Sequence, residues 1–468
     1  MMMSEKTKGQ LLSEKLTYTK KNAYEKNPDE KDEIFSYCEE YKKYLDSGKT
    51  ARSASREAVK MAQANGFKEY NFGANVKVGD KYYYVNRDRS LFLFIIGSEN
   101  IEKGIRIIAS HIDSPAIDIR ANPVYEAGGM AFFRTHYYGG IKKYQWTAIP
   151  LALHGIITDK SGKKIDVCIG ENDDDPIFYI NDLLPHLAQE QCAKSLREGV
   201  DGEMLNIVLG SIPYDDEAVN EKIKLNVLAI LNEKYGITEE DFLSAELTIV
   251  PALKAKDVGL DRSLIASYGH DDRVCAYPSL TALFSLQSPE HTVMAVLADK
   301  EETGSNGATG MKGSALDDII TDISVSMGKN ERLVRANSMC LSADVCAAYD
   351  PNFANAFEKN NSAIVGCGIG LAKYTGARGK SDTNDATGEY TAKIARIFNE
   401  NNVVWQTCEM GKIDFGGGGT VAKFIAERNI DTIDAGVPVI SMHAPYELVS
   451  KADVYNMHKA SKAFFESK

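Results

Sequence analysis

The chain has 468 residues, and its 44% hydrophobic and 26% charged residues are typical of a folded globular protein and not of a disordered one. This length favours two domains over one compact core. The formal net charge of -12 argues against nucleic acid as a partner, because a phosphate backbone is bound by a basic surface. It fits a cationic ligand better, such as the free amino group of a peptide.

The sequence contains no signal for a membrane or for secretion. No stretch approaches the roughly 20 apolar residues that cross a bilayer, and residues 1–8 lack the apolar core of a signal peptide. The 8 cysteines form no C-x-x-C pair, and most lie in apolar surroundings, which favours reduced thiols. We therefore expect a soluble, cytoplasmic protein that has no membrane partner.

The first 122 residues predict helices followed by strands. Residues 1–28 are polar and lysine-rich, and we expect an arm that lies on a surface. Apolar residues at helical spacing predict helices over 29–45 and 53–64. The strands of this part are predicted over residues 81–85, 91–96 and 105–109.

The composition changes after Pro123. To about residue 249 the chain is richer in glycine, aromatic residues and short alternating runs, such as the predicted strand over 151–158. Beyond Pro251, apolar strands again alternate with amphipathic helices, which indicates an α/β fold with a largely parallel sheet. These elements are predicted over 292–298, 339–343, 403–408 and 439–442 for strands, and over 385–399, 420–427 and 453–465 for helices. We interpret residues 123–248 as a β-rich domain inserted into an α/β domain.

Four polar clusters each follow a predicted strand, and functional groups gather at the carboxyl ends of strands in open α/β sheets. The first cluster contains His111 and Asp113, whose side chains point the same way on an extended chain. A metal-bound imidazole usually donates its other N–H to a carboxylate. Taken alone, such a pair is more often a solvated strand end.

The second and third clusters are acidic. Asp271 and Asp272 precede an apolar segment, where one carboxylate could bridge two metal ions, although aspartate is also favoured at a helix N-terminus. Glu301 and Glu302 follow the strand at 292–298. One could bind a metal while the other takes a proton from water, and a charged surface turn explains the pair equally well.

The fourth cluster consists of Asp344 and His443, each of which closes an apolar strand. A hydrogen-bonded core histidine is the ordinary explanation of His443. Two histidines and three carboxylates at strand ends of one sheet are together an N/O ligand set suited to zinc, cobalt or manganese. The five residues of this set are His111, Asp271, Glu302, Asp344 and His443. They predict a hydrolase that uses two metal ions.

Two weaker signals remain. The glycine run 416–419 precedes Thr420 and could lie against a bound substrate through Gly418, Gly419 and Thr420, while a plain loop is an equal alternative. His186 lies in the inserted domain, where its residue type favours a structural role.

These residues, in this order, resemble the aminopeptidase I and aspartyl aminopeptidase family of co-catalytic zinc metallopeptidases. The resemblance runs along nearly the whole chain. Its motifs are His111–Pro115, Pro185–Ala188, Asp271–Asp272, Glu301–Ser305, Ser342–Asp344 and Met442–His443 with Glu447.

The resemblance implies a three-layer α/β/α catalytic domain, residues 1–122 and 249–468, interrupted by a domain, 123–248, that pairs subunits. It implies two zinc ions, with cobalt or manganese as possible substitutes. Asp271 would bridge the ions, His111 and Asp344 would complete one site, and Glu302 and His443 the other. Glu301 would be the general base and Asp113 the partner of His111, while His186 would reach a neighbouring subunit's active site. Family members are commonly homo-dodecamers built from dimers.

The expected activity is removal of the N-terminal residue from short peptides. Lys373 matches a lysine of members that prefer acidic residues, but residues 374–380 depart from the pattern that follows it, so acidic and neutral preferences both stay open. The alternatives are a deacylase or carboxypeptidase of the same fold, a phosphohydrolase, and a non-catalytic peptide-binding assembly. Deacylases and carboxypeptidases could use the same five ligands, whereas a phosphohydrolase would need clustered Arg and Lys that the motifs lack.

Overall fold

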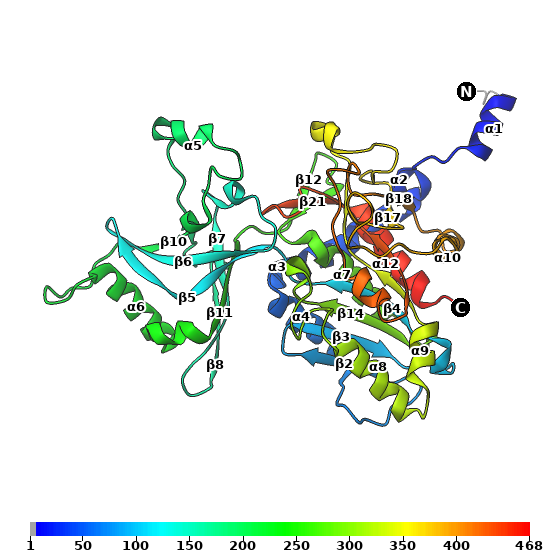
Figure 1. The fold of residues 1–468 in the computed structure, drawn as a ribbon, viewed down its shortest axis with the longest axis horizontal. Helices are drawn as coiled ribbons and strands as arrows, with labels where there is room; N and C mark the ends of the chain where they lie inside the picture. Colours follow the sequence, from blue (N-terminus) through cyan, green and yellow to red (C-terminus); the bar gives the residue numbers. More distant parts are fainter. Residues whose placement is uncertain (1–5) are drawn as a thin grey trace.

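The computed structural model describes residues 6–468, which form a mixed α/β fold, as predicted (Figure 1). They contain three β-sheets. The largest sheet has nine strands in the order β1-β2-β3-β14-β4-β15-β19-β17-β18. Its four central strands, β14, β4, β15 and β19, are parallel to one another. The strand bounds are β1 Lys68–Glu69, β2 Lys81–Asn86, β3 Ser90–Ile95, β4 Arg106–His111, β14 Val293–Ala298, β15 Met339–Ser342, β17 Ile369–Ala372, β18 Trp405–Thr407 and β19 Asp431–Gly436.

Helices cover both faces of the nine-stranded sheet, because its strands are apolar on both sides. In β3, Leu91 and Leu93 belong to one core, and the alternate residues Phe92 and Phe94 belong to the other. The first core is closed by α3 Lys31–Ser47, α4 Ala51–Ala64, α7 His270–Ser285, α10 Gly388–Glu400 and α12 Lys451–Phe465. The second is closed by α8 Ala315–Ser326, α9 Glu331–Asn337 and α11 Ala422–Ala426.

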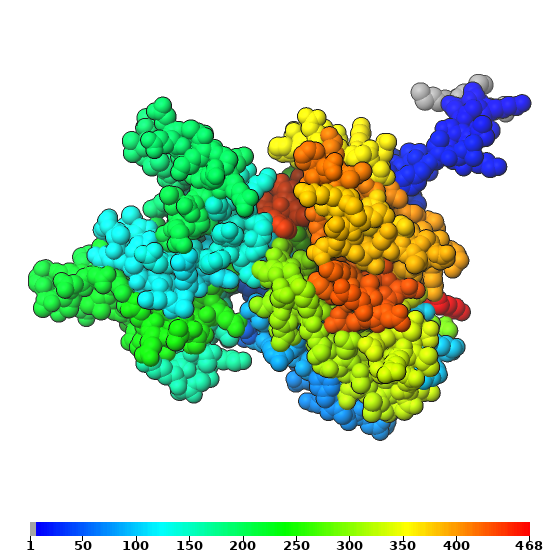
Figure 2. All heavy atoms as spheres, in the orientation of Figure 1, coloured from blue at the N-terminus to red at the C-terminus, as the bar shows by residue number. Residues whose placement is uncertain are grey.

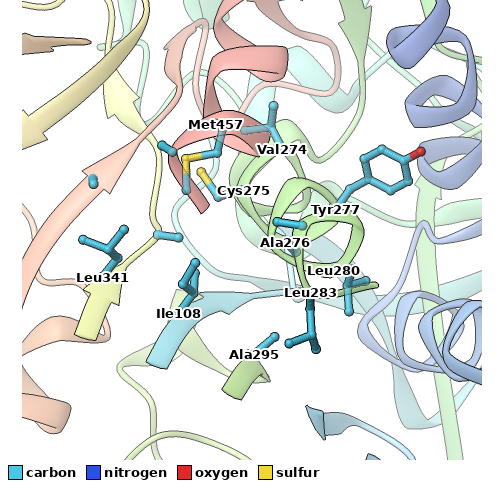
Figure 3. Close-up of a cluster of buried hydrophobic side chains, with 14 of the residues drawn as sticks. Ile108, Val274, Cys275, Ala276, Tyr277, Leu280, Leu283, Ala295, Leu341 and Met457 are labelled. Atoms are coloured by element: carbon cyan, nitrogen blue, oxygen red, sulfur yellow. The ribbon is translucent and has the colours of Figure 1, made fainter. Parts of the chain in front are cut away.

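The first core contains buried residues of the central strands β4, β14 and β15. In Figure 3, Ile108 of β4 and Ala295 of β14 lie near α7, and Leu341 of β15 lies further along the same core. Met457 of α12 lies beside Cys275 of α7. The side chains of Ile108 and Leu341 are fully buried. This packing fixes the ends of the central strands relative to the start of α7.

The second sheet is antiparallel throughout and lies at one side of the molecule, to the left in Figures 1 and 2. Its order is β8-β7-β11-β5-β6-β10-β9. The bounds are β5 Ala116–Ala127, β6 Met130–Tyr138, β7 Leu151–Thr158, β8 Lys164–Ile169, β9 Tyr179–Ile180, β10 Ile207–Gly210 and β11 Ala245–Pro251. It has its own core around Trp146, with α6 Lys222–Tyr235 packed on β5 and β6, and it carries the short α5 Gln189–Ala193. We call residues 116–251 the seven-stranded unit.

The third sheet is small and contributes to the core of the first. It has the order β12-β13-β21-β20-β16. Its bounds are β12 Lys256–Val258, β13 Leu264–Ser267, β16 Cys346–Ala347, β20 Pro438–Ile440 and β21 Glu447–Ser450. Ile265, Val439 and Val449 of this sheet are buried in the same core as α7. The two sheets therefore meet at α7.

The N-terminal segment differs from the expected arm. Helix α1, Lys8–Leu16, contains no buried residue and projects away from the molecule (Figure 1), so the expectation that it lies on a surface is wrong. Its apolar residues are too few to anchor it, since Leu11, Leu12 and Leu16 are each more than half exposed. Contact with the rest of the chain begins at Tyr18, whose Oη accepts from Thr407 N at 3.1 Å, and Ala23 of α2, Ala23–Lys26, is buried. Residues 1–5 of the expected arm lie outside the described residues. No helix within residues 6–468 is long and apolar enough to span a membrane.

Candidate metal and active site

The residues of the predicted site converge from two sheets. His111 ends β4, Asp344 follows β15, and Glu302 lies in the single turn η7, Glu301–Thr303, after β14. These three strands are parallel neighbours, so their carboxyl ends meet. Asp271 and His443 instead follow β13 and β20 of the five-stranded sheet.

The expectation that all five residues follow strands of one sheet is therefore wrong for Asp271 and His443. The physical reason is the buried contact at α7, which places the end of the small sheet beside the ends of the central strands. Neither strand contains a local signal of which sheet it joins.

Asp271 lies between the two imidazoles. Its Oδ1 is 3.1 Å from His111 Nε2, and its Oδ2 is 3.1 Å from His443 Nε2. Each imidazole faces a second carboxylate: Asp344 Oδ1 is 3.7 Å from His111 Nε2, and Glu302 Oε2 is 3.4 Å from His443 Nε2. One carboxylate with an oxygen toward each of two imidazoles is the arrangement that a bridging ligand of two cations would have.

The cluster is suited to metal ions by geometry. His111, Glu301 and Asp344 can offer ligand atoms within 4.8 Å of one another, and so can His111, Asp271 and Glu302. Asp271 Oδ1 and Glu302 Oε1 are buried and accept no hydrogen bond from the described residues. A buried carboxylate oxygen without a donor is costly, and a bound cation would supply the missing partner.

The electrostatics of the cluster point the same way. Burial and the neighbouring Asp271 raise the pKa of Glu302 well above its usual range. Burial raises the pKa of Glu301 to about 8. His111 acts against this rise, whereas Asp344 and other carboxylates add to it. Burial raises the pKa of Asp344 as well. Positive charge placed among these groups would relieve their mutual repulsion.

Both imidazoles are held so that Nε2 faces the cluster. His111 Nδ1 lies 2.9 Å from the backbone oxygen of Asp113, and His443 Nδ1 lies 2.9 Å from that of Gly140. Burial lowers the pKa of His443, but Asp271 and Glu302 outweigh it and raise that pKa to about 10. A hydrogen bond at Nδ1 is the usual way to orient a metal-binding histidine.

Asp113 joins the strand end of β4 to the turn that carries the glutamates. Its Oδ1 accepts from Glu301 N at 3.1 Å, and its Oδ2 accepts from Glu302 N at 3.2 Å and from Tyr138 Oη at 2.7 Å. Burial raises the pKa of Asp113, but His111 outweighs it and lowers that pKa. Asp113 therefore stays ionised beside His111.

Sequence reasoning assigned no role to Glu447. Its Oε2 accepts from the backbone N–H of Asp271 at 3.1 Å, and its Oε1 accepts from that of His443 at 2.6 Å. The side chain is buried. The only sequence signal is an acidic residue four positions after His443, which cannot show that it also reaches Asp271.

A cavity of about 460 Å³ opens in front of the cluster. Gly418, Gly419 and Thr420 line it, as do Met410 and other side chains, so the glycine run is brought to the site. Thr420 Oγ1 donates to Asp434 Oδ1 of β19 at 2.7 Å, which holds this loop against the sheet.

Lys373 and His186 are not brought to this cavity. Lys373 Nζ lies 3.3 Å from Asp385 and is not part of the cavity lining. His186 lies in the turn Pro185–Leu187 of the seven-stranded unit, where it is exposed and lines a separate hollow with Leu183. Leu184 and Leu187 beside it are also exposed.

Known proteins share this fold and sequence. A family model described as aminopeptidase I zinc metalloprotease (M18) matches residues 44–465. A probable M18 family aminopeptidase 1 of Clostridium acetobutylicum is 46% identical over 456 residues, covering 96% of this chain and 98% of the relative. The crystal structure of the M18 family aminopeptidase from Thermotoga maritima matches with a TM-score of 0.92 at 40% identity, covering 97% and 100% of the two chains. The mApe1 dodecamer of S. cerevisiae matches in fold, with a TM-score of 0.73 at 21% identity over 92% and 96%.

Fold and sequence together define a zinc metallopeptidase. The chain belongs to the aminopeptidase I (M18) family, which confirms the resemblance found in its motifs. It is a metal-dependent aminopeptidase.

Proposed function

We propose that this aminopeptidase holds two zinc ions and removes the N-terminal residue from short peptides. Asp271 would hold both ions, His111 and Asp344 would complete one site, and Glu302 and His443 would complete the other. The observation that carries this proposal is the position of Asp271, whose two oxygens each lie 3.1 Å from a different imidazole. Cobalt or manganese could take the same N/O donors.

Ions bound in such a pair polarise a peptide carbonyl and lower the pKa of a water molecule. The general base is Glu301, whose Oε2 lies 4.0 Å from His111 Nε2 and which borders the cavity. Burial and neighbouring carboxylates raise its pKa to about 8 in the metal-free cluster, against the opposing effect of His111. Bound cations would lower the pKa from there, toward that of a base near neutral pH.

In this reaction Glu301 accepts a proton from water as the water oxygen bonds to the scissile carbonyl carbon. The C–N bond then breaks, and Glu301 returns the proton to the leaving amine nitrogen. Asp113 holds the backbone of Glu301 throughout. One ion or a nearby carboxylate would hold the free α-amine of the substrate, which would make the enzyme an exopeptidase.

Substrate contacts are proposed for the glycine run, because Gly418, Gly419 and Thr420 line the cavity. The backbone can approach a peptide closely there. Lys373 would reach a substrate only after its ion pair with Asp385 opens. The preference for acidic or neutral N-terminal residues therefore stays open.

We also propose the larger architecture that the family resemblance implies. A three-layer α/β/α catalytic domain, residues 1–122 and 249–468, is interrupted by an inserted domain, 123–248, that pairs subunits. The separate core of the seven-stranded unit and its exposed leucines support this. Twelve subunits would assemble from dimers, as in the S. cerevisiae mApe1 dodecamer, with His186 reaching a neighbouring active site. The free cysteines fit a cytoplasmic location.

The test is the Glu301→Gln variant. Its carboxamide cannot accept the proton, so initial rates on aminoacyl-arylamides should fall by about 10²–10⁴-fold, while metal analysis should still give two zinc ions per chain. Glu400→Gln, an exposed change on α10, is the control and should keep full activity. Rates near those of the unmodified enzyme in Glu301→Gln would rule out this role. N-acetylated forms of the same arylamides should not be hydrolysed, which separates an aminopeptidase from a deacylase.

A further inference from the structure

Three consecutive residues of the seven-stranded unit lie against the metal cluster. Tyr138 ends β6, and Gly139 and Gly140 follow it. Tyr138 Oη donates to Asp113 Oδ2 at 2.7 Å, and the Gly140 oxygen accepts from His443 Nδ1 at 2.9 Å. One short segment thus contacts a residue that orients His111 and also contacts His443 directly.

The two glycines are required by this close approach. A Cβ atom on Gly139 would lie 3.3 Å from Glu302 Cβ and 3.4 Å from its Oε2, and the φ of Gly139 is +72°. A Cβ atom on Gly140 would lie 3.3 Å from His443 Nδ1. The side chains of Glu302 and His443 therefore pack directly against the backbone of Gly139 and Gly140.

Tyr138 acts on the other imidazole through Asp113. The Asp113 carboxylate is held by two backbone N–H groups of the Glu301–Glu302 turn and by the Tyr138 hydroxyl. Burial and the charge of Asp113 raise the pKa of Tyr138, so its hydroxyl stays a donor. Without that donor, only the two backbone N–H groups would hold the Asp113 carboxylate, and its Oδ1, 3.4 Å from His111 Nδ1, would be positioned less firmly.

We propose that Tyr138, Gly139 and Gly140 are positioning residues of the metal centre, so that the placement of the seven-stranded unit sets how tightly the ions are held. This inference rests on the proposed function, because it takes His111 and His443 as ligands. Partners of metal ligands typically change metal affinity by about 10–100-fold when they are lost. The unit that we propose to pair subunits would then also tune the metal centre.

The first experiment compares Tyr138→Phe with Tyr137→Phe. Neighbouring residues of a strand point to opposite faces, and Tyr137 is 42% exposed and bonds to no residue of the cluster. Metal-free full-length protein is titrated with Co²⁺ while its visible absorption is followed. Tyr138→Phe should bind at least one ion about 10-fold more weakly, and Tyr137→Phe should match the unmodified protein.

The second experiment compares Gly140→Ala with Gly388→Ala. The added methyl group at Gly140 would press on His443, whereas at Gly388 nothing lies within 4 Å. Gly140→Ala should weaken binding of one Co²⁺ ion and shift its absorption bands. Gly388→Ala should do neither. Thermal unfolding of all four metal-free variants should show that each is fully folded at the temperature of the titration, although Tyr138→Phe loses one buried hydrogen bond.

These experiments distinguish a failure of the positioning role from a failure of the proposed two-ion site. If the unmodified protein binds two Co²⁺ ions but Tyr138→Phe and Gly140→Ala bind like their controls, the inference is overturned and the proposed function stands. Weakened binding that occurs equally in Tyr137→Phe and Gly388→Ala would also overturn it. If the unmodified protein takes up no Co²⁺, the two-ion proposal itself fails.

Discussion

At the scale of single residues, the site depends on buried carboxylates that each serve two partners. Glu447 accepts from the backbone of Asp271 and of His443, and Asp113 accepts from the turn that carries Glu301 and Glu302. His443 lies in a left-handed backbone conformation, with φ at +65°. Such a conformation persists only where its surroundings hold it, and Glu447 supplies that support.

The Glu447→Gln variant tests this support. A carboxamide keeps one acceptor oxygen and points an NH₂ group at the other backbone N–H, so one bond becomes a clash. We expect about 1–3 kcal/mol of lost stability in the metal-free protein and zinc binding weakened by about 10–100-fold. Thermal unfolding and a zinc competition titration measure the two effects. Unchanged zinc affinity would show that Glu447 does not position the ligands.

The raised pKa values predict how the metal-free protein responds to pH. His443, with a folded pKa of about 10, stabilises the fold fully below its ordinary pKa of 6.5 and loses this contribution as pH rises through 10. Glu447, with a pKa of about 8, likewise loses its contribution as pH rises from 4.5 through 8.

The melting temperature in excess chelator should therefore fall between pH 5 and pH 9, measured by circular dichroism. Zinc should restore more stability at the alkaline end, because the ions displace fewer protons there. A melting temperature that rises over this range in chelator would contradict the assignment of these shifts.

At the scale of elements, the central strands are anchored in the core and hold the site residues at their ends. Leu341 of β15 is fully buried in the core that α7 and α12 close, and the same strand leads to Asp344. Truncation here removes methyl groups from a close-packed core and leaves a cavity.

Leu341→Ala should cost about 2–5 kcal/mol in the free energy of unfolding, measured by urea denaturation. Leu333 of α9 is 47% exposed, so Leu333→Ala is the matched control and should change the free energy by less than about 1 kcal/mol. Equal losses in the two variants would mean that the core around β15 does not carry the stability assigned to it.

Strands with uninterrupted apolar runs could be predicted from the sequence, as β3, β4 and β14 were. Strand β19 was not predicted, because Asp431 and Asp434 interrupt it. Asp434 is tolerated there because it accepts a hydrogen bond from Thr420, a contact made only in the folded chain. Helix α8 was missed although its apolar residues, Leu316, Ile319, Ile320 and Ile323, have helical spacing.

For the candidate site, the sequence predicted which residues take part better than it predicted how they are arranged. Local pattern drew attention to His111 and Glu302 because each follows a predicted buried strand. It could not show that Asp271 and His443 come from a second sheet, since strand pairing between distant segments leaves no local pattern. The same limit hid Tyr138 and Gly140, whose contacts with the site exist only because the seven-stranded unit folds back onto it.

At the scale of the whole molecule, the seven-stranded unit offers an apolar surface with no partner among residues 6–468. Leu184 and Leu187 are 50% and 68% exposed beside His186. Leu187→Glu should reduce the mass of the assembly in light scattering, because a buried charge without a partner is costly in an interface. Leu260→Glu, at a fully exposed residue near the five-stranded sheet, is the control and should leave the mass unchanged. Identical masses for the two variants would place the interface elsewhere.

The seam between the nine-stranded and five-stranded sheets runs through the cluster, with Asp271 and His443 on one side and His111, Glu302 and Asp344 on the other. Ions held across this seam would tie its two sides together. Without the ions, only protein contacts would hold the two sides together. Amide protons of β13 and β20 should therefore exchange with solvent faster in chelator than with zinc bound.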